Sequence, residues 1–285
     1  MKEIPAEIKE DVKGVMHAAY KDILHPSMQV VGKSLGATLE FFLTPFAGLQ
    51  LVNDRMKANI QRRLQQYAEK LQQVPKMQQC EVHPELGVPI LQRLSYTTND
   101  DIANMFVELL THASNMDTVG LAHPSFIPII DRLSPDEARL LKYIHESNNI
   151  VLYVNFRAKP IKEKVNQEGA LKLDMSYVEL KKWLTIVERD VHLDFPENLP
   201  LYWANLISCG LVYDAEEIGL TEFDEKYKEI EEYNKIEVIR QELVPSKYRE
   251  INPRHSFFQL TALGMQFLAA CVIEPASQTA TFTKH

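Results

Sequence analysis

Asp174, Glu179 and Lys181 are the residues whose types and spacing come closest to a catalytic pattern. In metal-dependent nucleases, two carboxylates in a D…E-x-K arrangement hold a cation, and the lysine supports the attacking water. The pattern is short, and here it lies where we expect a helix to begin, a place where acidic residues followed by lysines are ordinary. A metal-dependent nuclease is therefore only a minor alternative for this chain.

Histidines and cysteines offer no stronger site. His112 and His123 would have to approach each other around the loop between them to bind a metal or act as a base. No Asp, Glu or His spacing completes such a ligand set. Cys80, Cys209 and Cys271 lie far apart without a C-x-x-C pair, which predicts free thiols in a reducing cytosol.

Other catalytic signatures are missing from the sequence. It contains no G-x-S-x-G, P-loop or G-x-G-x-x-G motif, so hydrolase, NTPase and dinucleotide-binding functions have no support. We accordingly expect a protein that is not an enzyme, with no catalytic residues, no cofactor, no metal and no evident small-molecule substrate.

An apolar run and the basic segment after it form the candidate contact surface. Leu35–Val52 is strongly apolar but short, and Gly36, Glu40 and Pro45 interrupt it, so we expect a core helix rather than a membrane span. A sharper interpretation is conditional membrane insertion or surface binding, because the neighbouring arginines would meet anionic headgroups. The candidate membrane or partner surface comprises Phe41, Phe42, Leu43, Phe46, Arg55, Lys57, Arg62 and Arg63.

Charge is unevenly distributed along the chain. Residues 1–79 hold 11 Lys and Arg against 8 Asp and Glu, whereas residues 80–285 hold 20 against 31. An acidic C-terminal part does not favour wrapping a phosphate backbone, so nucleic acid is a disfavoured partner. The acidic stretch Glu216–Glu242 is either a solvated excursion or a docking face for a basic partner. We expect a protein partner or self-association.

Helical patterns account for the N-terminal part. Apolar residues at helical spacing predict helices near residues 6–24, 53–74, 84–96, 100–113 and 125–133. Asn99 is a good N-cap, and Ser134, Pro135 and Glu137 form a capping box that starts a helix over 135–146. The connector between these helices and the capping box form the candidate structural hinge, which comprises His123, Pro124, Ser125, Phe126, Ser134 and Glu137.

The C-terminal part has a different pattern. We expect helices over 177–191 and 196–209, the second ended by Gly210 as a left-handed C-cap. Short strands follow at Leu211–Tyr213 and Phe257–Leu260, and a helix begins directly after the second strand. This order is that of a winged-helix module with an enlarged wing.

These expectations define a mainly α fold with two domains and a tail. A helical domain covers residues 1–133, a winged-helix-like domain with a small β-wing and the acidic insertion covers 134–276, and a tail covers 277–285. In a DNA-binding winged helix, the helix over 196–209 would enter the major groove. That helix contains an acid, two prolines and no Lys or Arg, so it offers no good phosphate or guanine contact.

Five stretches of the chain together carry a family resemblance: LQLVNDRMKANIQRRLQQYAEKL, VHPELGVPILQRLSYTTNDDIANMFVELLTHASN, AHPSFIPIIDRLSPDEARLLKYI, NLISCGLVY and FFQLTALGMQFLAACV. With these stretches the chain resembles the Abi-alpha (abortive infection alpha) family of bacterial proteins. The HPSF…LSPDEA block is the most specific of them. The resemblance covers most of the chain, and least of all residues 160–175 and 219–254.

The resemblance implies a role in abortive infection, which is antiphage defence in a bacterial host. The family supplies no agreed catalytic site, so no catalytic residue is carried over. We expect the protein to act by protein or membrane interaction in the cytoplasm, with the periphery of the inner membrane as a second location. The alternative is a DNA-binding winged-helix regulator of a defence locus, and the metal-dependent nuclease ranks below it.

Overall fold

The computed structural model describes residues 34–36, 38, 54–160, 177–216, 218–244 and 248–273. The described chain is mostly helical, at 58%, and contains one four-stranded antiparallel sheet curled into a half-barrel. It forms two compact units: the described residues of Met1–Ala138 with those of Gln266–His285, and those of Arg139–Met265. The domain boundary expected near Leu133 stays a prediction.

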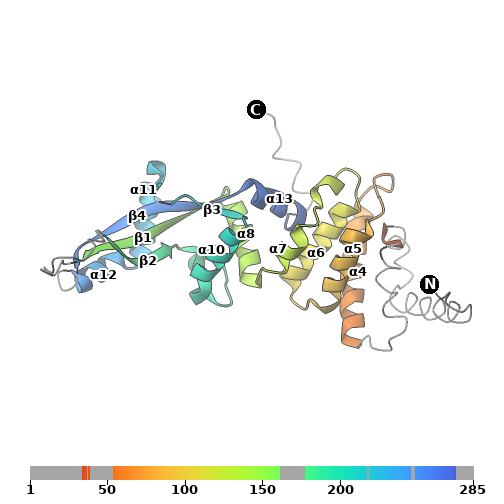
Figure 1. Ribbon diagram of the computed structural model, residues 1–285, viewed down its shortest axis with the longest axis horizontal. Helices are drawn as coiled ribbons and strands as arrows, with labels where there is room; N and C mark the ends of the chain where they lie inside the picture. The colour runs from red at the N-terminus through yellow and green to blue at the C-terminus, as the bar shows by residue number, and fades with distance from the viewer. Residues whose placement is uncertain are drawn as a thin grey trace, which may run out of the picture. The chain divides into compact units, whose positions relative to one another are not determined.

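Three helices, α4 (Asp54–Gln73), α5 (Pro84–Tyr96) and α6 (Asp100–Ala113), pack against one another to build the first unit (Figure 1). Each helix turns one apolar stripe inward, as the helical spacing predicts. The stripe of α6 includes the fully buried Leu109 and Leu110. Two short elements, η3 (Val119–Leu121) and α7 (Phe126–Ile130), follow α6.

Helix starts in this unit confirm the predicted caps. The Asn99 side chain accepts a hydrogen bond of 3.1 Å from the Ile102 amide at the start of α6. At the start of α8 (Pro135–Glu146), the Ser134 amide donates to the Glu137 carboxylate at 2.6 Å, and the Glu137 amide donates to the Ser134 hydroxyl at 3.3 Å. This reciprocal pair is a capping box, which satisfies amides that the first helical turn leaves unpaired.

The sheet lies in the second unit, in the order β2-β1-β4-β3 (Figure 1). Its strands are β1 (Ile150–Pro160), β2 (Val178–Leu184), β3 (Val212–Asp214) and β4 (Tyr248–Leu260). The two long central strands pair along their whole length. The expected strands near 211–213 and 257–260 are confirmed as β3 and the end of β4, and α13 (Ala262–Cys271) begins directly after it.

The prediction of a helix over residues 177–191 is wrong. Val178–Leu184 forms the edge strand β2, and only the single turn α9 (Val187–Asp190) is helical. β2 is held by its pairing with β1, and Leu180 and Leu184 pack on the core beneath the sheet. Because the β1 residues that pair with β2 lie 20 to 30 positions earlier in the chain, local spacing did not reveal the strand. The winged-helix arrangement is likewise not shown, since the long β1–β4 pair dominates the sheet.

Helices of the second unit cover the sheet. After η4 (Pro196–Asn198), the predicted second helix is confirmed as α10 (Leu199–Ser208), and Gly210 has the left-handed φ of 72° expected of its C-cap. The acidic stretch forms η5 (Thr221–Phe223), α11 (Asp224–Tyr233) and α12 (Ile236–Leu243).

The acidic helices are part of the core as well as of the surface. Tyr227, Ile230 and Ile236 are buried in one hydrophobic cluster with Val154 and Phe156 of β1. The stretch is therefore not simply a solvated excursion, because its apolar side closes one face of the sheet.

A polar network braces the other side of the sheet. Asp214 of β3 accepts hydrogen bonds from the Tyr153 hydroxyl and, at 3.0 Å, from the Trp183 indole nitrogen. The Trp183 amide donates to the Asn155 side chain at 2.8 Å, and Trp183 has a φ of 57°, a strained value for a bulky residue. These hydrogen bonds stabilise the strained Trp183 backbone at the point where the register between β1 and β2 shifts.

Candidate functional site

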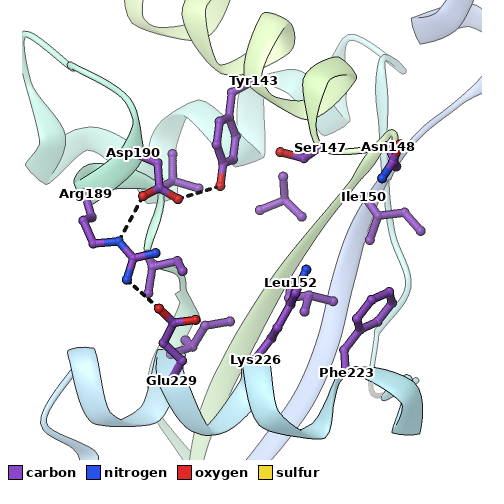
Figure 2. Close-up of a pocket in the computed structure, with 14 residues that line it drawn as sticks. Tyr143, Ser147, Asn148, Ile150, Leu152, Arg189, Asp190, Phe223, Lys226 and Glu229 are labelled. Carbon is purple, nitrogen blue, oxygen red and sulfur yellow. Dashed lines mark hydrogen bonds and ion pairs between the residues drawn. The ribbon is translucent and has the colours of Figure 1, made fainter.

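A cavity of about 330 Å³ in the second unit is a candidate site (Figure 2). We call it the α8–α11 cavity. Its lining comes from the end of α8 and the turn after it, from the start of β1, from α9 with the residue before it, and from η5 and α11. The lining residues are Tyr143, Ser147, Asn148, Ile150, Val151, Leu152, Ile186, Val187, Arg189, Asp190, Phe223, Lys226, Glu229 and Ile230.

The floor of the α8–α11 cavity is apolar. Leu152 and Ile186 are partly buried, and both pack on the hydrophobic cluster that contains the buried Ile230. Phe223 belongs to the same set and faces the cavity from the start of α11. The floor is therefore the exposed end of the core between α11 and the sheet, and a ligand with an apolar body would extend that core.

The rim is polar, and most of its charges are paired. Arg189 donates to Asp190 at 2.9 Å and to Glu229 at 2.6 Å, so one guanidinium joins α9 to α11. The Tyr143 hydroxyl donates to the second oxygen of Asp190 at 3.1 Å. Figure 2 shows this chain of contacts along one side of the opening. Arg189 and both carboxylates lie at the surface, so their pairing fixes geometry more than it adds stability.

Two pKa shifts describe how the rim behaves. Burial raises the pKa of the Tyr143 hydroxyl, and the nearby Asp190 carboxylate raises it further. Hydrogen bonds to Asp190 and then to Glu229 raise the pKa of the Arg189 guanidinium. Tyr143 therefore keeps its proton at neutral pH and donates a hydrogen bond to Asp190, and Arg189 remains a cation paired with Asp190 and Glu229, so these contacts hold the rim of the cavity in place.

The turn before β1 shapes the mouth of the cavity. Asn148 and Asn149 both have left-handed φ values, 57° and 66°. Asparagine tolerates this region better than most residues, and two in succession allow the chain to turn sharply from α8 into β1. The Asn149 amide closes the turn on the Ile144 carbonyl at 2.9 Å. This turn places Ser147 and Asn148 beside the opening.

Sequence reasoning did not find this cavity. Its rim residues Tyr143, Arg189, Lys226 and Glu229 come from three separate segments and form no motif. The adjacent Arg189 and Asp190 lay in the helix that was predicted wrongly over 177–191. The one usable signal in the sequence was the set of apolar residues in the acidic stretch, and such residues indicate a hydrophobic core rather than a binding site.

The predicted membrane or partner surface is only partly described. Phe41, Phe42, Leu43 and Phe46 lie outside the described residues, as do the side chains of Arg55 and Lys57, although their backbone belongs to α4. Of the described helices, none combines the length and the apolar character that a membrane crossing needs.

Arg62 and Arg63 differ sharply in their surroundings. Arg62 is half exposed and contacts Asp100 at 3.1 Å. Arg63 is fully buried, donates to Asp100 at 2.6 Å and donates to Gln66 at 3.0 Å. Its guanidinium joins α4 to the first turn of α6. Helical spacing alone did not show that Arg63 is buried, and the contact surface itself stays a prediction.

The predicted hinge residues fall into two groups. His123 is exposed and shares a 2.7 Å hydrogen bond with the Ser125 hydroxyl. Phe126 is buried and packs edge-to-face on Phe267, with the two ring centroids 5.5 Å apart. Pro124 lies in the turn between them, and Ser134 and Glu137 form the capping box described above. Their role as a hinge stays a prediction.

The weaker catalytic alternatives gain no geometric support. Asp174 lies outside the described residues, and Glu179 and Lys181 lie in β2 instead of at a helix start. His112 is buried, whereas His123 is exposed. Across the described ranges, no three His, Cys, Asp or Glu side chains are grouped to hold a metal ion. Cys80, Cys209 and Cys271 are free thiols, as predicted.

Comparisons with known proteins give one strong similarity. The model of a family described as abortive infection alpha matches residues 55–271. A solved structure of an uncharacterized protein from the hydrocarbon-degrading marine bacterium Alcanivorax borkumensis SK2 matches 54% of this chain and 94% of its own, with 16% identity and a TM-score of 0.31. No curated protein is significantly similar to the chain.

Proposed function

This chain belongs to the abortive infection alpha family, and we propose that it is an antiphage defence protein that acts by binding rather than by catalysis. The observation that carries the proposal is the family match, which spans both compact units of the chain. Family membership suggests the biological role, and the molecular role has to be argued from the site.

The α8–α11 cavity supports a binding role. An apolar floor of partly buried side chains below a rim of fixed donors and charges is the usual composition of a ligand site. A group that transfers protons works best when its pKa lies near the working pH. At this rim the pKa values of Tyr143 and Arg189 are raised, which moves them further above neutral pH and keeps both groups protonated.

Protection of cells is the experiment that tests the proposal. Bacteria that express the protein, or carry an empty vector, are challenged with a panel of phages at low and at high multiplicity. Abortive infection predicts fewer infective centres at both multiplicities and collapse of the culture only at the high one. If no phage in a broad panel forms fewer plaques, or if heavily infected cells survive and divide, the proposal is wrong.

A blocked cavity tests the binding part of the proposal. Ser147→Phe places a ring at the cavity mouth, and we expect it to abolish protection without changing the amount of folded protein. Lys142→Ala is a control on α8, the helix that ends directly before Ser147, because Lys142 is exposed and lies outside the cavity lining. Full protection by Ser147→Phe would remove the cavity from the mechanism and leave the defence role to another surface.

A further inference from the structure

We propose that the α8–α11 cavity binds a small amphiphile with an apolar body and one anionic group, which pairs with Lys226. The inference deepens the proposed function, because this ligand would be what the defence protein binds at that site. It rests on three observations, which are the size of the cavity, its apolar floor and the position of one cation at its rim.

Size and lining limit the ligand to a small molecule. A cavity of about 330 Å³ lies at the lower end of the range that accommodates drug-sized ligands. Ile150, Leu152, Ile186 and Phe223 supply aliphatic and aromatic contacts on the floor. Covering them with an apolar body removes their surface from water, which is the main source of affinity in such sites.

Charge identifies the polar end of the ligand. Asp190 and Glu229 are both compensated by Arg189, and Asp190 also accepts from Tyr143. Lys226 is different, because its ammonium lies 5.3 Å from the centre of the Phe223 ring and forms no ion pair with any described residue. Figure 2 shows its side chain pointing from α11 toward the cavity beside Leu152.

The same charges argue against other ligand classes. A cation would meet carboxylates that Arg189 already compensates, and it would lie near the Lys226 ammonium. A polyanion such as a nucleotide triphosphate would have one lysine to pair with and two carboxylates nearby to repel it. One anionic group facing Lys226, with the apolar body on the floor, satisfies both parts of the lining.

Binding of two fluorescent probes to the purified full chain tests the proposal. 8-Anilinonaphthalene-1-sulfonate is an aromatic monoanion of suitable size, and N-phenyl-1-naphthylamine is its uncharged counterpart. We expect saturable binding of both, with one site for each chain. Lys226→Met should weaken sulfonate binding about fivefold, as for a partly exposed ion pair, and leave the neutral probe unaffected. Lys226→Arg should retain sulfonate binding.

Two further variants show whether the probes occupy this cavity. Ser147→Phe should reduce the binding of both probes, because it fills the mouth. Lys228→Met should affect neither, because Lys228 lies two positions along α11 and is not part of the lining. Circular dichroism of each variant establishes that the fold is retained.

The result that would overturn the proposal is sulfonate binding of equal strength in wild type and Lys226→Met, or no saturable binding at all. Probe binding is measured on purified protein without phage. A failure here would therefore leave the protection assay valid, and a failure of that assay would leave the ligand chemistry standing.

Discussion

The imidazole ring of His112 is buried in the first unit. It is 1% exposed, and neither ring nitrogen has a hydrogen-bond partner in the described part of the chain. Burial lowers its pKa, and the charge of Lys70, which pairs with Glu108 at 2.6 Å, lowers it further. His112 is therefore neutral when the protein is folded, and protonation inside would be costly.

This arrangement predicts a loss of stability in acid. The unfolded histidine takes up a proton as the pH falls through about 6.5, whereas the folded one resists, so the free energy of unfolding falls with pH. The slope contributed by one such group reaches at most about 1.4 kcal/mol per pH unit. His112→Leu should remove that contribution and flatten the stability curve between pH 7 and pH 5.

Urea unfolding at a series of pH values measures the effect. His192→Asn is a suitable control, because the His192 side chain is 89% exposed. An unchanged acid slope in His112→Leu, or an equal flattening in the control, would contradict the assignment.

At the scale of elements, the contact between the start of α13 and β3 is unusually close. A Cβ atom added at Gly264 would lie 2.1 Å from the carbonyl oxygen of Leu211, the residue before β3. Nearby, the Thr261 amide donates to the same carbonyl at 3.0 Å. Only a residue without a side chain lets the helix begin this close to the backbone.

Gly264→Ala should therefore destabilise the second unit. Alanine favours a helix by about 1 kcal/mol, but a clash with backbone costs more than this gain, and we expect a net loss of about 2 kcal/mol. Gly120→Ala is the matched control, because nothing lies within 4 Å of its added Cβ, and it should change stability little. Thermal unfolding of both variants measures these changes in stability. A Gly264→Ala variant as stable as wild type would show that the contact between α13 and Leu211 is not tight.

Elements with strong local signals were predictable, and elements held by distant partners were not. Capping by Asn99 and Ser134 and the left-handed turn at Gly210 depend on residues a few positions apart, which the sequence displays directly. The β1 strand is largely buried on both faces, so it lacks the alternation of a half-exposed strand. The α8–α11 cavity was still less predictable, because it needs the positions of α8, α9 and α11 at once.

At the scale of the whole molecule, net charge is the basis of our prediction about DNA binding. The chain carries 31 Lys and Arg against 39 Asp and Glu, a net charge of −8. Of the two described arginines proposed for a contact surface, Arg63 is buried and Arg62 is paired with Asp100. Both of these described arginines are engaged by Asp100, which leaves them less able to replace the counterions of a phosphate backbone, the main source of non-specific affinity.

We therefore expect no binding of duplex DNA tighter than about 10 μM at 150 mM salt, close to the range of non-specific binding. Fluorescence anisotropy of a labelled duplex, titrated with protein at several salt concentrations, measures this directly. Submicromolar binding that weakens steeply with salt would contradict the prediction and favour the regulator of a defence locus. Arg62→Ala would then identify the surface, since it removes a half-exposed cation and leaves Arg63, which also contacts Asp100, in the chain. Weak binding at every salt concentration would agree with a defence protein whose partner is not DNA.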